Sequence, residues 1–137
     1  MHGELGRWRE TPLAALALIL VLDQFPRNMF RGTARAFSSD PPALAAARKM
    51  TEKGFDRLLT PAERTFAYLP FQHAEDLAAQ RRALELCGAL DAGVFGYAKR
   101  HYEIIARFGR FPHRNSILGR ESTAEELEFL RGPGSSF

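Results

Sequence analysis

An uninterrupted apolar run, PLAALALILVL at residues 12–22, is the feature that most limits how this chain can fold. Pro12 suits the first turn of a helix, where its missing N–H costs nothing. The run is apolar on nearly every side of a helix extending to about Phe25, where Pro26 would end it, and such a helix must be surrounded by other elements. It is too short to span a membrane, which takes about 20 apolar residues. The run therefore predicts a buried core helix and no membrane association.

The rest of the chain is also typical of helices, because no segment alternates apolar and polar residues as a half-buried strand would. Start and stop signals predict further helices from Pro41 to just before Gly54, from Pro61 to Pro70, from His73 to Leu90, from Ala92 to Phe108, and over residues 122–130. Two of these starts carry capping-box spacing, Thr60 with Glu63 and Ser122 with Glu125. We expect one all-α domain over residues 1–137, a tetratricopeptide-like array of antiparallel helices, with a compact helical bundle as the alternative.

Composition excludes several functional classes. The single cysteine, Cys87, cannot form an internal disulfide, which fits a reducing cytoplasm. The net charge of +3 is spread over both signs and is too small to predict nucleic-acid binding. Sixteen of the 19 basic residues are arginines, whose planar group suits carboxylates and phosphates. The chain has no nucleophile elbow, Walker loop, dinucleotide fingerprint or metal-ligand motif pair, so we expect no cofactor and no metal.

Polar residues on otherwise apolar helix faces are the candidates for catalysis. Helical spacing predicts that His73, Asp76 and Gln80 form one patch, and His101 falls in the apolar stripe of the helix at 92–108. A carboxylate beside a histidine could orient a general base, or the pair could bind a metal. A buried hydrogen-bond network is the commoner use of such groups. The candidate catalytic residues are His73, Asp76 and His101.

Two similar blocks, FPRNMFRGT at 25–33 and RFGRFPHRN at 107–115, gather arginines beside Phe-Pro steps. We interpret them as a structural clasp that keeps Phe25 and Phe111 in the core and offers arginines to buried carboxylates such as Asp23. Asp23 ends the apolar run, and its burial would be costly unless a cation such as Arg27 pairs with it. If arginines outnumber the local carboxylates, the surplus predicts an anion site. The candidate ligand-binding residues are Asp23, Arg27, Asn28, Gln80, Arg110, His113, Arg114 and Asn115.

The chain resembles a bacterial family of uncharacterised proteins, domain-of-unknown-function family 924, in three blocks: LALILVLDQFPRNMFRGTARAFSSD, FAYLPFQHAEDLAAQ and RHYEIIARFGRFPHRNSILGRESTAEELEFL. The similarity covers residues 12–137 and implies a tetratricopeptide-like all-α fold with no established activity. The family pattern falls here on Asp23, Gln24, Arg27, Asn28, Arg31, His73, Glu75, Asp76, Gln80, His101, Arg107, Arg110, His113, Arg114, Asn115 and Arg120. The family's longer, tryptophan-rich N-terminal segment is short in this chain, which implies an open groove or a partner chain in its place.

Three functional hypotheses follow. In the first, a cytoplasmic helical-repeat-like module binds an acidic peptide or a small oxyanion through Arg27, Arg110 and Arg114. In the second, a small hydrolase or metal-assisted enzyme uses His73 or His101 as base and Asp76 to orient it, while arginines stabilise the oxyanion. In the third, these polar groups only hold the fold together. We expect no nucleic acid and no membrane as partners, while a second copy of the chain could pair through the exposed first helix.

Overall fold

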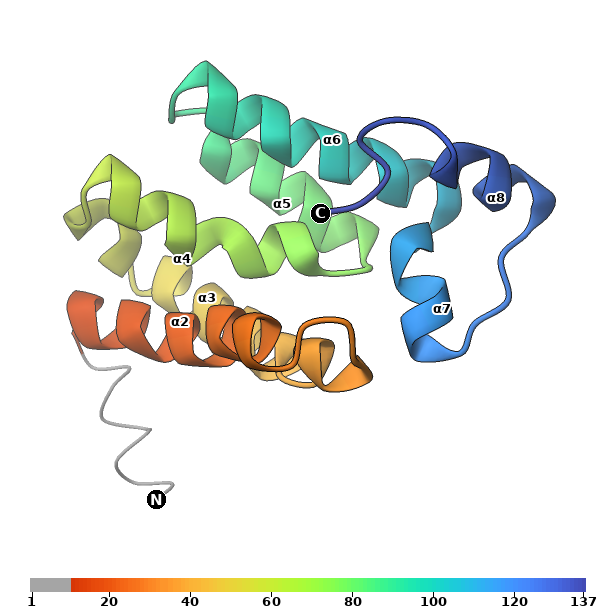
Figure 1. Ribbon diagram of the computed structural model, residues 1–137. Coiled ribbons are helices and arrows are strands. Elements are labelled where there is room, and N and C mark those ends of the chain that lie inside the picture. The colour runs from red at the N-terminus through yellow and green to blue at the C-terminus, as the bar shows by residue number, and fades with distance from the viewer. Residues whose placement is uncertain (1–10) are drawn as a thin grey trace.

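The computed structural model describes residues 11–137, and the regular secondary structure of that range is entirely helical (Figure 1). Its elements are α2 (Pro12–Met29), η1 (Ala34–Phe37), α3 (Asp40–Glu52), η2 (Phe55–Leu58), α4 (Pro61–His73), α5 (Leu77–Cys87), α6 (Ala92–Phe108), η3 (Pro112–Arg114), α7 (Asn115–Leu118) and α8 (Ala124–Leu130). The prediction of an all-α fold is confirmed, and the tetratricopeptide-like description stays a prediction.

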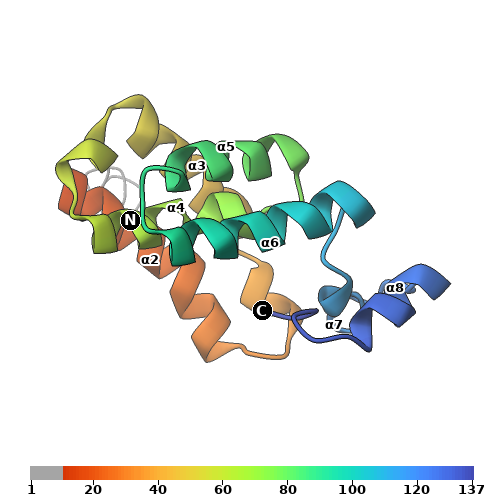
Figure 2. The same ribbon diagram turned by 90° about the horizontal axis from the view of Figure 1, so that it is seen from above.

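Helix α4 lies at the centre of the packing. Each of the helices α2 to α6 packs against the next along the chain, and α4 also contacts α2 and α6. Figure 1 shows these helices stacked side by side, with α7 and α8 set apart at one end, and Figure 2 shows α7 and α8 below that end of α6. The main core lies between helices α2 to α6 and includes Leu18, Ile19, Met50 and Phe71. This arrangement places the ends of α2 and α4 opposite the α7–α8 segment.

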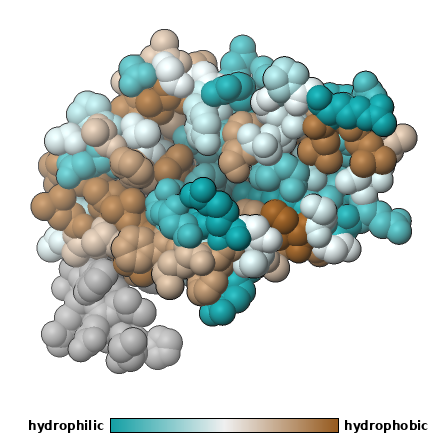
Figure 3. Space-filling model, in the orientation of Figure 1, coloured by the Kyte–Doolittle hydropathy of each residue, from teal (hydrophilic) through white to brown (hydrophobic). Residues whose placement is uncertain are grey.

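The apolar helix α2 is exposed only towards its two ends. Leu18 and Ile19 are fully buried, as the sequence predicts, but Leu13, Phe25 and Met29 are 64%, 54% and 70% exposed. The prediction that Phe25 lies in the core is therefore wrong, whereas Phe111 is buried as expected. Figure 3 shows apolar side chains gathered on the surface at the α2 end of the molecule. No helix in residues 11–137 is long and apolar enough to cross a membrane.

Pro26 and Pro70 lie inside α2 and α4, so the predicted helix ends at these prolines are wrong. Each proline has three helical residues after it, and proline normally costs a helix about 3 kcal/mol by removing a backbone donor and crowding the preceding turn. Side chains bind the carbonyls of these last turns: Arg27 Nη1 donates to the Asp23 carbonyl at 2.9 Å, and Gln80 Nε2 donates to the Gln72 carbonyl at 2.7 Å. The extra turns carry Arg27 and His73 towards the site described below.

Other helix ends follow the capping signals, except that the helix predicted from His73 to Leu90 spans only Leu77–Cys87, because Asp76 caps its start. Helix α6 has the predicted bounds, and the capping box of Thr60 with Glu63 is present. The last helix begins at Ala124 rather than at residue 122, because Thr123 and Glu126, and not Ser122 and Glu125, form its capping box. Ser122 instead accepts a hydrogen bond from Asn115 Nδ2 at 3.0 Å. The local signals therefore place most of the helices, and tertiary contacts decide the exceptions.

Candidate functional site

Asp23 and His73 form a buried pair between the last turns of α2 and α4. The distance from His73 Nδ1 to Asp23 Oδ1 is 2.7 Å, and Arg27 Nη1 lies 3.2 Å from the same oxygen. Burial opposes the charge on Asp23, but the hydrogen bond from His73 and the charge of Arg27 outweigh it, so the pKa of Asp23 is lowered. Burial also lowers the pKa of His73 despite its bond to Asp23. His73 is thus a neutral imidazole at neutral pH that donates through Nδ1, which leaves the lone pair on Nε2.

Two arginines continue this network toward the C-terminal segment. Arg27 binds both oxygens of Asp40, at 2.7 and 2.9 Å, in the bidentate geometry that gives strong pairs. Arg114 Nη1 lies 3.6 Å from Asp40, and its Nη2 donates to the His73 carbonyl at 2.9 Å. The Arg114 guanidinium lies over the rings of Phe37 and Phe111, 4.4 and 4.7 Å from their centres. Burial lowers the pKa of Arg114 to about 10, so the side chain remains a cation at neutral pH.

A third ion pair, which the sequence did not predict, joins Glu75 to Arg120. Arg120 Nη1 and Nη2 bind the two Glu75 oxygens at 2.8 and 3.0 Å, and the Phe111 N–H donates to Glu75 Oε2 at 2.7 Å. Arg120 Nε also donates to Asn115 Oδ1 at 3.0 Å. These bonds hold the α7 segment, and with it Arg114, against the end of α4. The family pattern includes both residues, but their 45-residue separation hid the pairing.

The predicted patch of His73, Asp76 and Gln80 does not form. Helix α4 ends at His73 and Asp76 caps the start of α5, accepting from the Ala79 N–H at 2.9 Å with about half of its side chain exposed. The assignment of Asp76 as the residue that orients His73 is therefore wrong, because the two residues do not share a helix and Asp23 takes that position. Gln80 is buried and binds backbone carbonyls, which is a structural role.

Three other residues that the sequence predicted to bind a ligand lie away from the His73–Arg114 network or have a structural role. Arg110 pairs with Glu126 at 2.7 and 2.9 Å and with the Glu121 carbonyl, so it fixes α8 rather than joining Arg27 and Arg114. Asn28 is exposed at the surface end of α2. Asn115 is fully buried and is held by Ser122 and Arg120. The seam expected from the sequence is thus reduced to Asp23, Arg27, His113 and Arg114.

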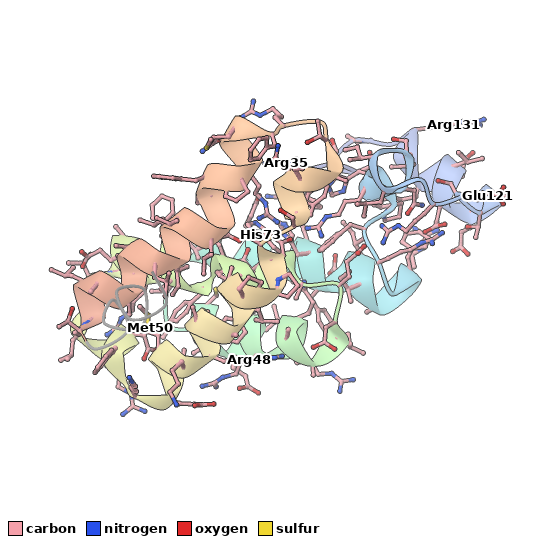
Figure 4. The ribbon with its side chains drawn as sticks, turned by 90° about the horizontal axis from the view of Figure 1, so that it is seen from below. Arg35, Arg48, Met50, His73, Glu121 and Arg131 are labelled. Atoms are coloured by element: carbon pink, nitrogen blue, oxygen red, sulfur yellow. The ribbon has the colours of Figure 1, made fainter. Side chains whose placement is uncertain are left out.

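Three of these four residues, Arg27, His113 and Arg114, line a cavity of about 200 Å³ that we call the histidine–arginine pocket. Its polar lining comprises Gln24, Arg27, His73, Tyr97, His101, His113 and Arg114, and its apolar lining includes Phe37, Phe111 and Phe137. No Asp or Glu side chain among residues 11–137 lines the pocket. In Figure 4, His73 lies near the centre of the molecule, whereas Glu121 and Arg131 mark its far end. The two predicted catalytic histidines, His73 and His101, therefore line one cavity, with ring centres 6.2 Å apart.

Three buried polar atoms of this lining have no hydrogen-bond partner among the described residues: His101 Nε2, His113 Nδ1 and Arg114 Nε. His101 Nδ1 lies 2.9 Å from the Tyr97 carbonyl, so Nδ1 carries the proton and Nε2 carries a lone pair. Burial lowers the pKa of both His101 and His113 to about 4, so both rings are neutral at neutral pH. The pocket thus presents an unused guanidinium donor from Arg114 together with imidazole lone pairs from His73 and His101.

The ion-pair network as a whole is balanced in charge. Its anions are Asp23, Asp40 and Glu75, and its cations are Arg27, Arg114 and Arg120. The surplus of arginines that would by itself predict an anion site is absent from this described network. The histidine–arginine pocket differs from the network as a whole, because Arg27 and Arg114 line the pocket while the carboxylates of the network do not.

Two other kinds of site have little support. Within residues 11–137, no group of three or more His, Cys, Asp or Glu side chains is arranged to hold a metal ion. Cys87 is buried, and burial raises the pKa of its thiol to about 11, so the thiolate that reacts as a nucleophile is scarce at neutral pH.

Comparisons with known proteins agree with the resemblance seen in the sequence. The model of the family described as "Bacterial protein of unknown function (DUF924)" matches residues 1–134. A solved structure of a protein of unknown function from Agrobacterium tumefaciens is 48% identical, with a TM-score of 0.92 over 96% of this chain and 75% of that one. A search of curated proteins finds no match. These relatives confirm the fold and carry no assigned activity.

Proposed function

We propose that this chain, which belongs to the bacterial DUF924 family, binds a small oxyanion that also carries a hydroxyl group. The ligand occupies the histidine–arginine pocket. The observation that carries the proposal is that three buried polar atoms without a partner belong to side chains lining this one cavity. Because buried polar groups are nearly always hydrogen-bonded in folded proteins, a ligand that pairs these atoms recovers free energy that the unliganded protein forgoes.

The pattern of donors and acceptors defines the ligand. The Arg114 Nε–H and the two guanidinium charges favour an anionic oxygen, while the lone pairs on His73 Nε2 and His101 Nε2 need an O–H or N–H donor. An oxyanion without a hydroxyl would leave the buried His101 Nε2 unpaired, at a cost of about 1–3 kcal/mol. The ligand is therefore a hydroxy acid or a protonated phosphate rather than a bare tetrahedral anion such as sulfate.

The size of the pocket decides between the two ligands expected from the sequence. A cavity of about 200 Å³ is below the usual range of roughly 300–1,000 Å³ for sites that enclose drug-sized molecules. It accommodates a compact head group but not an acidic peptide segment. We therefore favour the small oxyanion over the acidic peptide.

Isothermal titration calorimetry with inorganic phosphate, glycolate and sulfate at pH 7 tests this proposal. Phosphate and glycolate are expected to bind, with sulfate about 10-fold weaker or worse, since an unpaired acceptor costs about 1–3 kcal/mol. Arg114→Gln should abolish binding of both ligands, and Arg131→Gln, an exposed arginine at the far end of the molecule, should change nothing. The proposal is wrong if neither phosphate nor glycolate binds, or if sulfate binds equally well.

A second candidate function, hydrolysis of a bound ester by water, is favoured by the Asp23–His73 pair. A neutral histidine oriented by a carboxylate at 2.7 Å has the arrangement of a general base. His73 Nε2 would accept the water proton as the water oxygen attacks the ester, and the proton would pass to the departing alcohol. Turnover of chromogenic esters that His73→Gln and Asp23→Asn both reduce, and Asp76→Asn does not, would favour this function; no turnover would leave binding as the proposed role.

A further inference from the structure

A second, larger cavity of about 440 Å³ adjoins the histidine–arginine pocket, and we call it the apolar pocket. Its apolar walls come from η1, α3, the end of α4 and α7, through Ala34, Phe37, Pro41, Leu44, Ala74 and Leu118. Three side chains, Phe37, His73 and Arg114, line both cavities. The two cavities therefore meet at these three side chains.

The carboxylates and the hydroxyl group of the apolar pocket are already engaged within the protein. Both oxygens of Asp40 are bound by Arg27, and both oxygens of Glu75 are bound by Arg120. Ser38 Oγ donates to the Arg35 carbonyl at 2.8 Å. A ligand in this cavity therefore meets apolar side chains and carboxylates whose oxygens are already hydrogen-bonded. It gains binding free energy there by burying hydrocarbon rather than by forming hydrogen bonds.

We infer that the ligand of the histidine–arginine pocket is an amphipathic acid whose hydroxylated anionic head lies in that pocket and whose apolar body fills the apolar pocket. This inference rests on the proposed function, because the head group is the oxyanion proposed above. The three shared side chains, Phe37, His73 and Arg114, place the apolar cavity directly beside the groups that hold the head. Hydroxy acids and phosphate monoesters that carry an alkyl or aryl tail belong to this class.

Arg114 also lies close to two aromatic rings at this junction. Its guanidinium carbon is 4.4 Å from the ring centre of Phe37 and 4.7 Å from that of Phe111, and its Nε has no partner among the described residues. A guanidinium at the junction of the cavities can bind an anionic oxygen while the Phe37 ring contacts hydrocarbon. The junction thus has the polarity change that an amphipathic ligand requires.

Calorimetric titration with a homologous series tests the inference: glycolate, 2-hydroxybutyrate, 2-hydroxyhexanoate and 2-hydroxyoctanoate. Burial of one methylene tightens binding about fourfold. Each two-carbon step is therefore expected to lower the dissociation constant by roughly 16-fold, until the tail exceeds the cavity. Tails longer than the cavity are expected to give no further gain.

Two variants locate the tail. Leu118→Asp puts a charge into the apolar pocket and should remove the dependence on chain length while leaving glycolate binding intact. Leu58→Asp places the same charge at a site that is 75% exposed and lies in η2, outside both cavities, and should keep the full dependence. If Leu118→Asp fails to fold, Ala34→Trp, which fills the cavity from an exposed position, gives the same comparison.

The outcomes separate the two proposals. Glycolate binding with a flat series would overturn the amphipathic ligand and leave the proposed function standing. A gain with chain length that persists in both Leu118→Asp and Ala34→Trp would show that the tail binds elsewhere, which also overturns the inference. Absence of binding by phosphate and by every acid of the series would contradict the proposed function and the inference together.

Discussion

Replacing Asp23 by alanine tests whether the Asp23–His73 pair supports the fold. The carboxylate is 1% exposed, accepts hydrogen bonds from His73 and Arg27, and ends the most apolar segment of the chain. Its loss leaves the His73 Nδ1–H without its acceptor, and removal of one partner of a buried pair costs about 3–5 kcal/mol. Arg27 keeps its bidentate bond to Asp40, which limits the damage. We therefore expect Asp23→Ala to lower the free energy of unfolding by about 3 kcal/mol.

Urea unfolding at pH 7, followed by circular dichroism, measures this change. With a slope of about 2 kcal/mol per molar urea, the midpoint should fall by about 1.5 M. Asp76→Ala is the matched control, because Asp76 caps α5 from a half-exposed position and its loss should cost only about 1 kcal/mol. If Asp23→Ala costs no more than Asp76→Ala, Asp23 is not the buried partner of His73 that the geometry indicates.

Three further outcomes follow from the structure. The pKa values of about 4 for His101 and His113 lie below the value of 6.5 for a free histidine. As the pH falls, the unfolded chain therefore binds protons before the folded chain does. The free energy of unfolding should be greatest above pH 6.5 and fall steadily towards pH 4. Urea midpoints measured across that range check this, and His101→Gln should reduce the slope. Cys87 should react with a thiol reagent only after unfolding, and rapid reaction in the native state would contradict its burial. Light scattering should show self-association that Phe25→Asp removes, since the exposed Phe25 and Met29 near the end of α2 predict pairing of two copies; a monomer at all concentrations would contradict this.

The sequence alone determined the features that depend on near neighbours along the chain. Capping residues and glycines mark most helix ends, as at the start of α4 and at both ends of α6, because these signals act within one turn. The bond between Arg27 and Asp23 was also predictable, since residues four apart lie on one helix face. The apolar run at 12–22 predicted a core helix, but the exposure of apolar residues towards the ends of α2 was not visible in it.

The tertiary structure decided the site. Pro26 and Pro70 end helices by local rules, yet α2 and α4 continue past them, and Arg27 and Gln80 bind carbonyls of the last turns. His73 lies three residues from Asp76 but pairs with Asp23, 50 residues away. Spacing along a helix cannot reveal such a pairing, because it depends on which helix ends meet after the core has packed. The candidate histidines and arginines were therefore readable in the sequence, while their partners and the cavities between them arise only from the packing of α2, α4 and the α7 segment.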